Sequence, residues 1–336
     1  MKLTITPVDL KLKHRFTTNI DSRTVQHSHI VQIQQDGLVG IGEVTAHPFY
    51  KISREKILEE GDSIKNFLDG KELSTPEKMW QEISTLLPDN RFLLSGIDVA
   101  INDLYAKQRS KTLHEIWELE RNELPLTSYT IGLDTLEVMG NKLNEVPWPV
   151  YKIKLGTEDD LAVIQSLRTL TQAPFRVDAN CAWNKKQLHT LSRAFKELNV
   201  EYIEQPLHPD VKDDIKESLH ESVLPLFADE SFKTENDIPF CSKYYTGINI
   251  KLVKCGGLTP AKKIAETAIR LGAEIMIGCM TESSIGISAA AQLLPYAKYA
   301  DLDGALLIEN DIADGLTIDY GKMEYGEGYG IGCKLL

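Results

Sequence analysis

The fold of this chain is decided by the stretch Val150-Tyr151-Lys152-Ile153-Lys154-Leu155-Gly156. Its β-branched and aromatic residues, followed by a glycine, predict a strand. Successive side chains of a strand point to opposite faces, so Lys152 and Lys154 share one face. Two interpretations are open. The strand lies either at a sheet edge with a solvated lysine face, or inside a barrel with two amines pointing inward.

The chain after Pro125 repeats this pattern and favours the barrel. Short apolar runs alternate with helical stretches, which indicates βαβ units and a parallel sheet. Five successive strands end in an ionisable residue, at positions 154, 178, 204, 229 and 251, which lie 22 to 26 residues apart. The carboxyl ends of barrel strands surround the active site, so these side chains are expected to meet there. The eight predicted strands are Ser128–Ile131, Val150–Lys154, Phe175–Asp178, Tyr202–Glu204, Leu226–Asp229, Gly247–Lys251, Glu274–Gly278 and a stretch ending near Asp301–Asp303.

Length and composition limit the number of domains and the classes of partner. The 336 residues suit a (β/α)₈ barrel of ~250 residues with one further module. The net charge of -12 argues against nucleic acid or an anionic membrane as a partner. No apolar run approaches the ~20 residues that span a bilayer. Five scattered cysteines indicate a reduced, cytoplasmic protein, and we expect a homo-oligomer.

The first 122 residues predict a separate α+β domain, and residues 123–310 the barrel. Met1 to Leu12 alternates like a strand, and Asp36-Gly37 predicts a type I′ hairpin turn between His29–Gln34 and Leu38–Val44. The polar segment from Lys13 to His27, which contains Arg15 and Arg23, is predicted to be a loop. Three helical segments follow, which completes an α+β pattern.

Three carboxylates on neighbouring predicted strands indicate a metal site. Asp178, Glu204 and Asp229 end strands 3, 4 and 5 of the barrel. Converging carboxylates without a countercharge repel one another, and a hard divalent cation resolves the repulsion. All-oxygen ligation suits Mg²⁺, with Mn²⁺ as a substitute.

Two lysines and two aspartates lie around this predicted metal site. Lys154 ends strand 2 and Lys251 ends strand 6, on opposite walls of an eight-stranded barrel. Such a pair suits removing a proton from one face of a carbon and returning one to the other face. Asp301 and Asp303 lie across the mouth from the metal, where they suit either a turn or a socket for a substrate ammonium. A ligand with a carboxylate and an ammonium at that separation has the size of a dipeptide.

The chain resembles the muconate-lactonizing-enzyme subgroup of the enolase superfamily, and within it most closely the dipeptide epimerases. The resemblance covers nearly the whole chain and rests on Lys152-Ile153-Lys154, Val177-Asp178-Ala179-Asn180, Ile203-Glu204-Gln205-Pro206, Ala228-Asp229-Glu230-Ser231, Ile250-Lys251, Gly278-Cys279-Met280-Thr281-Glu282-Ser283 and the Asp301/Asp303 pair. It implies a modified TIM barrel, (β/α)₇β, with an α+β capping domain that the C-terminal tail, residues 311–336, rejoins. It also implies a Mg²⁺-dependent isomerase that inverts the α-carbon of the C-terminal residue of an alanine-containing dipeptide through an enediolate.

The resemblance also implies roles for individual residues. Lys154 and Lys251 would be the acid/base catalysts, and Lys152 would lie against the substrate carboxylate. Thr130 and Met280 match positions that line the substrate. The remaining roles are metal binding by Asp178, Glu204 and Asp229, and ammonium binding by Asp301 and Asp303.

Arg23 matches an arginine of the capping loop that meets the glutamate side chain in the glutamate-specific epimerases, and Arg15 lies in the same loop. Small or apolar dipeptides are an equally open alternative to glutamate-containing ones.

Two other functions are compatible with the same residues. The first is a lyase or cycloisomerase on the same scaffold, such as o-succinylbenzoate synthase or muconate cycloisomerase. Those substrates carry no ammonium, so Asp301 and Asp303 would then have no role. The second is a metal-binding interaction protein without catalysis, against which the complete set of bases and metal ligands argues.

Overall fold

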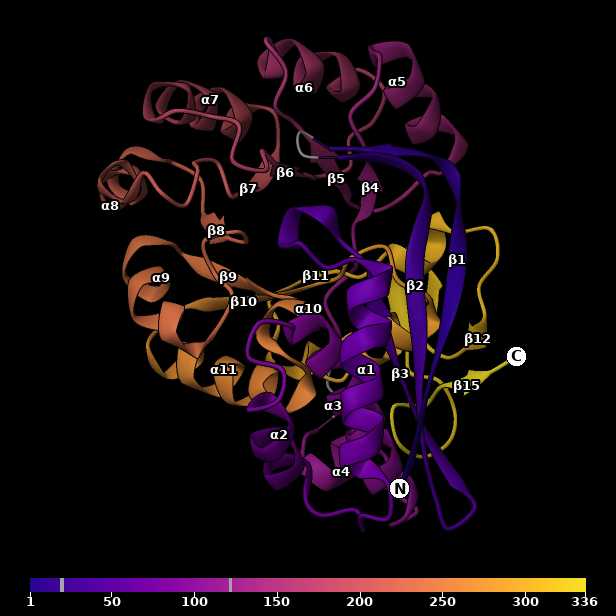
Figure 1. The fold of residues 1–336 in the computed structure, drawn as a ribbon. Helices are drawn as coiled ribbons and strands as arrows, with labels where there is room; N and C mark the ends of the chain where they lie inside the picture. Colours follow the sequence, from indigo (N-terminus) through magenta and orange to yellow (C-terminus); the bar gives the residue numbers. More distant parts are fainter. Residues whose placement is uncertain (19–20, 121–122) are drawn as a thin grey trace.

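The computed structural model describes residues 1–18, 21–120 and 123–336. It consists of a parallel sheet curled into a barrel and a capping domain whose antiparallel sheet lies beside it (Figure 1). The predicted fold, a modified TIM barrel with an α+β capping domain, is confirmed. The predicted division at residue 122 falls outside the described residues.

All eight predicted barrel strands are present, in sequence order around the sheet. The first and last strands approach each other through a parallel bridge between Thr127 and Ala300, which closes the barrel. Lys152 and Lys154 therefore lie inside a closed sheet, and the edge-strand interpretation is wrong. The strands are β4 (Tyr129–Ile131), β5 (Tyr151–Lys154), β6 (Phe175–Asp178), β7 (Val200–Glu204), β8 (Leu226–Ala228), β9 (Gly247–Ile250), β10 (Glu274–Gly278) and β11 (Tyr299–Asp301).

Helical segments connect each strand to the next, and the eighth strand has only a 3₁₀ turn, η4 (Gly304–Leu307), after it. This is the (β/α)₇β arrangement. The apolar sides of the helices pack on the outside of the sheet in one continuous core. The helices are α5 (Leu136–Glu145), α6 (Asp160–Arg168), α7 (Lys185–Glu197), α8 (Lys212–Glu221), α9 (Ile238–Tyr244), α10 (Leu252–Cys255), α11 (Leu258–Arg270) and α12 (Ser284–Ala291).

The interior of the barrel is divided between an apolar floor and a charged mouth. Tyr202, Phe227 and Met276 are fully buried and pack together inside the barrel. Glu204 and Asp229 lie two residues after Tyr202 and Phe227, so strand alternation points their side chains inward as well, at the mouth. The apolar floor therefore lies directly below these carboxylates.

Within its described residues, the capping domain contains three antiparallel strands and four helices. Asp36 and Gly37 have φ of 51° and 79°, as the predicted type I′ turn requires. Strand β3 approaches helix α3 closely, since a Cβ at Gly42 would lie 2.1 Å from the Gly96 carbonyl oxygen. The elements are β1 (Lys2–Thr17), β2 (Ser22–Gln35), β3 (Leu38–Thr45), α1 (Arg54–Leu68), α2 (Pro76–Ser84), α3 (Arg91–Lys107) and α4 (Leu113–Trp117), with a 3₁₀ turn η1 (Pro48–Tyr50) after β3.

The prediction of a loop from Lys13 to His27 is wrong. Strand β1 continues to Thr17 and β2 begins at Ser22, so the two form a long ribbon that reaches the barrel (Figure 1). The register shifts between Lys11 and Phe16, which accommodates the polar residues that obscured the strand pattern. The ribbon holds Arg23 on a paired strand, opposite Phe16.

The C-terminal tail contacts both parts of the molecule. The Ile331 amide donates to Asp103 of α3, and the Thr127 amide before β4 donates to the Gly321 carbonyl. The tail contains the short strands β12 (Ala313–Asp314), β13 (Thr317–Asp319), β14 (Lys322–Glu324) and β15 (Lys334–Leu335). Among the described residues, no helix combines the length and apolarity that a membrane crossing requires.

Candidate active site

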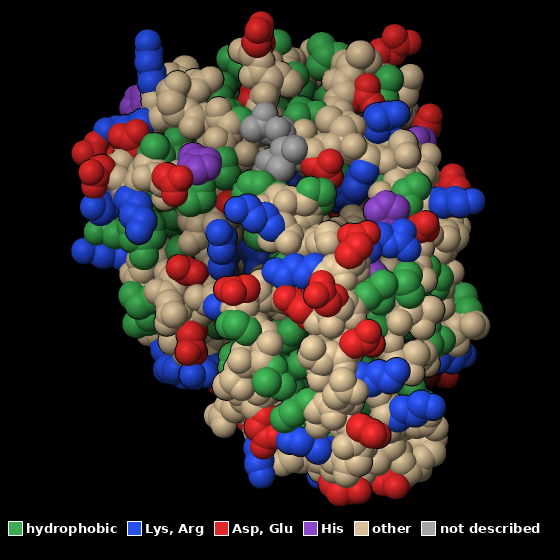
Figure 2. Space-filling view, viewed as in Figure 1, with side chains coloured by type: hydrophobic (Ala, Val, Ile, Leu, Met, Phe, Trp, Pro, Cys, Tyr) green, Lys and Arg blue, Asp and Glu red, His purple; other side chains and the backbone are tan. Residues whose placement is uncertain are grey.

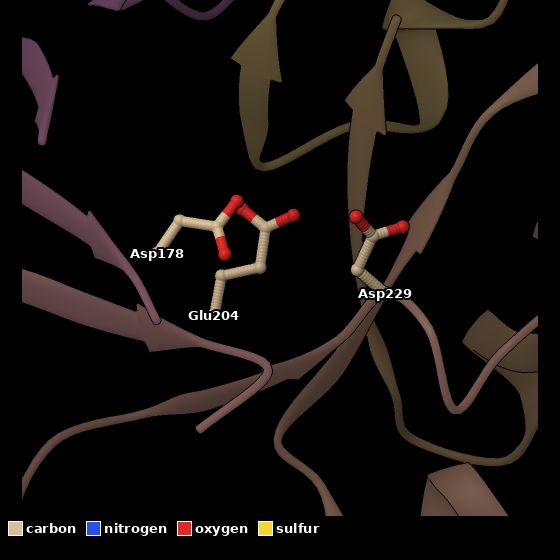
Figure 3. A group of neighbouring side chains, drawn as sticks. All are labelled: Asp178, Glu204 and Asp229. Atoms are coloured by element: carbon tan, nitrogen blue, oxygen red, sulfur yellow. The ribbon is translucent and has the colours of Figure 1, made fainter. Parts of the chain in front are cut away.

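Three buried carboxylates meet at the carboxyl ends of neighbouring strands. Asp178 ends β6, Glu204 ends β7, and Asp229 follows β8. Each offers an oxygen within 4.8 Å of the others, and the three side chains point into a common space (Figure 3). All three residues are at most 2% exposed. The predicted acidic cluster is therefore present.

Lysines neutralise this cluster from two sides. The Lys154 amine lies 2.7 Å from Asp178, and the Lys251 amine lies 2.8 Å from Asp229. Strands β5 and β9, which carry or precede these lysines, are four strands apart in the barrel, so the two amines approach from opposite walls. This is the arrangement that the strand count predicts.

Lys152 lies one step deeper than Lys154 and holds three carboxylates together. Its amine is 3.1 Å from Asp178, 2.7 Å from Glu204 and 2.6 Å from Asp301. Burial acts to lower the pKa of Lys152, but Asp301 and the other two carboxylates raise it well above the usual value. Lys152 is therefore a permanent cation beneath the site.

The carboxyl groups of the cluster have different acidities. Burial acts to raise the pKa of Asp229, but Lys251 and Lys254 outweigh it and hold the pKa well below its usual range. Burial and the neighbouring Asp178 raise the pKa of Glu204 to about 7. A divalent cation fits this site, because three clustered carboxylate oxygens form the hard ligand set that Mg²⁺ prefers.

Asp301 and Asp303 connect the last barrel strand to the first. Asp301 accepts hydrogen bonds from Lys152 and from the Ser128 hydroxyl at 2.6 and 2.8 Å. Asp303 accepts one from the Thr130 amide at 2.6 Å. Burial and the adjacent Asp301 raise the pKa of Asp303 to about 7. The two aspartates are thus unequal, since Asp301 is part of the lysine network and Asp303 lies outside it.

A pocket with about 700 Å³ of empty space, part of it open to solvent, lies above the carboxylate cluster. Figure 2 shows a hollow between the barrel and the capping elements, with lysine or arginine side chains at its rim. Nine of the eleven predicted site residues line the pocket, and Asp178 and Glu204 lie beneath it in contact with Lys152. Arg23 reaches the pocket from β2, whereas Arg15 lines a smaller neighbouring one.

Several polar residues of the site were not predicted from the sequence. The Lys254 amine binds Asp229 through a carboxylate oxygen and, at 2.7 Å, through its carbonyl oxygen. Asn249 donates to Glu204 at 2.7 Å, and Asn180 donates to Glu230 at 3.1 Å. Strand alternation offered a signal for Asn249, which lies two residues before Lys251. Lys254 had no such signal, because the short helix α10 that turns it inward is not evident in the sequence.

The fold and site together define a barrel enzyme with three clustered carboxylates that could hold a metal ion and two lysine amines on opposite walls. Family models match the chain as "Mandelate racemase / muconate lactonizing enzyme, N-terminal domain" over residues 1–117 and "Enolase C-terminal domain-like" over residues 139–336. The chain belongs to this family of the enolase superfamily.

Several similar proteins are epimerases of dipeptides. The L-Ala-D/L-amino acid epimerase of Flavobacterium johnsoniae is 44% identical over the whole of both chains. A substrate-liganded structure of the L-Ala-D/L-Glu epimerase from Bacillus subtilis is 28% identical, covers 99% of each chain and has a TM-score of 0.93. The Methylococcus capsulatus dipeptide epimerase, complexed with Mg and L-Arg-D-Lys, is 29% identical over 99% of each chain with a TM-score of 0.90.

Proposed function

We propose that this protein is a Mg²⁺-dependent dipeptide epimerase that inverts the α-carbon of the C-terminal residue of an alanine-containing dipeptide. The observation that carries the proposal is the pair Lys154 and Lys251, which approach the carboxylate cluster from opposite walls of the barrel. Inversion at carbon needs a base on one face and an acid on the other. The similar epimerases described above support dipeptides as the substrate class.

The mechanism assigns each charged residue a separate task. Asp178, Glu204 and Asp229 would hold Mg²⁺, and a cation bound there would supply positive charge beside the substrate carboxylate. Lys154 and Lys251 exchange the α-proton, one as the amine that accepts it and the other as the ammonium that returns one. Lys152, buried beneath them with three carboxylates, adds positive charge below the substrate carboxylate.

The substrate ammonium is assigned to the side of the pocket formed by β11 and β4. Asp303 lines the pocket there and contacts the Thr130 amide. Asp301 adds negative charge on the same side, but its carboxylate already binds Lys152. Met280, from the segment after β10, and Arg23, from the capping ribbon, line the pocket and would contact the side chain of the C-terminal residue.

Incubation in D₂O with Mg²⁺ tests this function directly. L-Ala-L-Xaa and D-Ala-L-Xaa libraries should take up deuterium at the α-carbon of the C-terminal residue and yield the epimer, followed by NMR and mass spectrometry. If neither deuterium uptake nor epimerisation occurred with any peptide, the proposal would be wrong.

The contacts of the two aspartates decide how to separate an epimerase from a cycloisomerase. Replacing Asp301 removes a partner of Lys152 and would impair any reaction at this site. Asp303→Asn leaves the lysine network intact and weakens only the proposed ammonium site. We expect it to raise KM for dipeptides strongly, and to leave turnover of an ammonium-free substrate of the cycloisomerase type unaffected.

Two further properties belong to the proposal. All five cysteines are free thiols, which supports residence in the reducing cytoplasm. We also expect a homo-oligomer that binds no nucleic acid. Light scattering after size exclusion tests the first expectation, and a filter-binding assay at low salt tests the second.

A further inference from the structure

An ion pair lies across the outer part of the substrate pocket. The Arg23 guanidinium donates to Asp21 at 2.5 Å and to the Thr281 hydroxyl at 3.2 Å. The Arg23 and Asp21 side chains are 17% and 27% exposed, so water screens the pair only in part. Thr281 comes from the segment after β10, so the contact joins the capping ribbon to the barrel.

The position of this pair is set by the geometry of the substrate below it. The reacting α-carbon lies between Lys154 and Lys251, and the ammonium lies toward Asp303. The carboxylate cluster closes the pocket from below, so the side chain of the C-terminal residue has one direction left, toward the capping domain. There the pocket is lined by the Arg23–Asp21 pair and by apolar groups, among them Phe16, Phe49, Met280 and Leu307.

The pair is held together more firmly than two separate ions at this exposure would be. Asp21 is two residues from Arg23 in the sequence, so their effective concentration is high. Phe16 lies opposite Arg23 on β1, with its ring centre 5.5 Å from the guanidinium carbon, and restricts its movement. A glutamate side chain of a substrate would therefore have to displace a tethered carboxylate and leave Asp21 without its partner.

We propose that the Asp21–Arg23 pair selects dipeptides whose C-terminal residue has an uncharged side chain, and that Asp21 excludes glutamate by occupying the guanidinium of Arg23. This inference rests on the proposed function, because it concerns the substrate class of that same site. A basic side chain is also disfavoured, since it would approach the Arg23 cation while Asp21 is already paired with Arg23.

The test compares L-Ala-L-Glu with L-Ala-L-Gln, which have nearly the same shape and differ in charge. The measured quantity is the ratio of kcat/KM for the glutamate peptide to that for the glutamine peptide. We expect the unmodified enzyme to favour glutamine at least about fivefold, and Asp21→Asn to raise the ratio about tenfold by freeing the guanidinium. The gain should shrink as the salt concentration rises.

Three further variants control this result. Asp36→Asn removes the same charge in the β2–β3 turn, at the other end of β2, where φ of 51° suits asparagine, and should leave the ratio unchanged. Arg23→Met should lower the ratio, and the double variant with Asp21→Asn should return it toward the unmodified value. A preference for glutamate in the unmodified enzyme, or a ratio that Asp21→Asn changes by less than twofold, would overturn the inference. If L-Ala-L-Gln exchanges its α-proton, the proposed function stands whatever the value of the ratio. If no peptide exchanges its α-proton, the proposed function is itself wrong.

Discussion

Buried carboxylates occur in two regions of this molecule, and each region stabilises them differently. At the barrel mouth, Asp178 and Asp229 are neutralised by lysine amines. At the cap–barrel seam, formed by Glu43 and Asp98 with their partners, backbone amides and hydroxyls of the barrel hold the carboxylates. Flexible lysine side chains therefore stabilise the carboxylates at the mouth, whereas polar groups without a charge stabilise those at the seam.

The seam contacts lie at the start of two barrel helices. Glu43 accepts hydrogen bonds from the Ser283 amide at 3.0 Å and the Gly286 amide at 3.2 Å, where helix α12 begins. Asp98 accepts from the amide and hydroxyl of Thr259 at 2.8 and 2.6 Å, in the first turn of α11. Anionic groups are favoured at helix N-termini, so these contacts fix the cap on the barrel.

This difference explains why the barrel mouth can catalyse a proton transfer and the cap–barrel seam cannot. A lysine beside a carboxylate can be replaced by a metal or move a proton, since its amine lies on a flexible stem. A backbone amide is fixed in the chain, so it can neither give way to a metal nor transfer a proton. The pKa values of the two aspartates at the mouth lie below their usual range because of lysines, whereas burial raises the pKa of Asp98 to about 7.

Removing Mg²⁺ should have the largest effect on activity and a small one on folding. With EDTA we expect turnover to fall to background and to return with Mg²⁺ or Mn²⁺. The fold should persist, because the lysines already neutralise the carboxylate cluster. Parallel activity assays and circular dichroism melts measure both. Full activity in EDTA would contradict the metal assignment, and unfolding in EDTA would contradict the role of the lysines.

Removing either catalytic lysine should cost about 10²- to 10⁴-fold in turnover. Lys154→Ala and Lys251→Ala should each abolish α-deuterium exchange from one configuration of the C-terminal residue more severely than from the other. Lys152→Ala should impair both configurations alike, because its amine lies below the reacting carbon. NMR exchange rates for the two epimers measure this. Lys262→Ala, which removes an amine from a helical ion pair on α11, is the matched control.

Glu43→Ala should lower the free energy of unfolding by about 1–3 kcal/mol, because it leaves buried amide donors of α12 without an acceptor. Glu43→Gln keeps one acceptor oxygen and should cost less. Met280 and Thr281 line the pocket and directly precede α12, so a shift of α12 would weaken substrate binding. KM should therefore rise more than kcat falls. Urea unfolding and steady-state kinetics measure these effects. Glu72→Ala, an exposed acid of the same domain, should change neither.

Asp98 should change how stability depends on pH. Its folded pKa of about 7 exceeds the ordinary value of 3.8, so the folded state binds more protons between these values. Its contribution to stability therefore falls as the pH rises from about 4 to 7. The amide in the Asp98→Asn variant does not titrate, so the melting temperature of the unmodified protein minus that of the variant should be smaller at pH 8 than at pH 5. An equal difference at both pH values would contradict the assignment.

Much of the barrel and its site could be predicted from the sequence, because strand alternation is local. Lys154, Asp178 and Glu204 each end a short apolar run, and the spacing of those runs counts the strands. The ribbon from Lys13 to His27 could not be predicted, since its polar residues carry no alternating pattern. Lys254 and the seam acid Glu43 were missed for a related reason, because their partners lie on other elements.

The sequence by itself therefore determined the strand order, the closed barrel and the identity of the residues at its mouth, because these depend on local period and on counting. Only the tertiary structure decided how those residues are paired. It placed Asp301 with Lys152 and left Asp303 outside that network, and it joined Lys254 of α10 to Asp229, which follows β8. The physical reason is that ion pairing depends on distances of a few ångströms between side chains from separate elements, which no local pattern encodes.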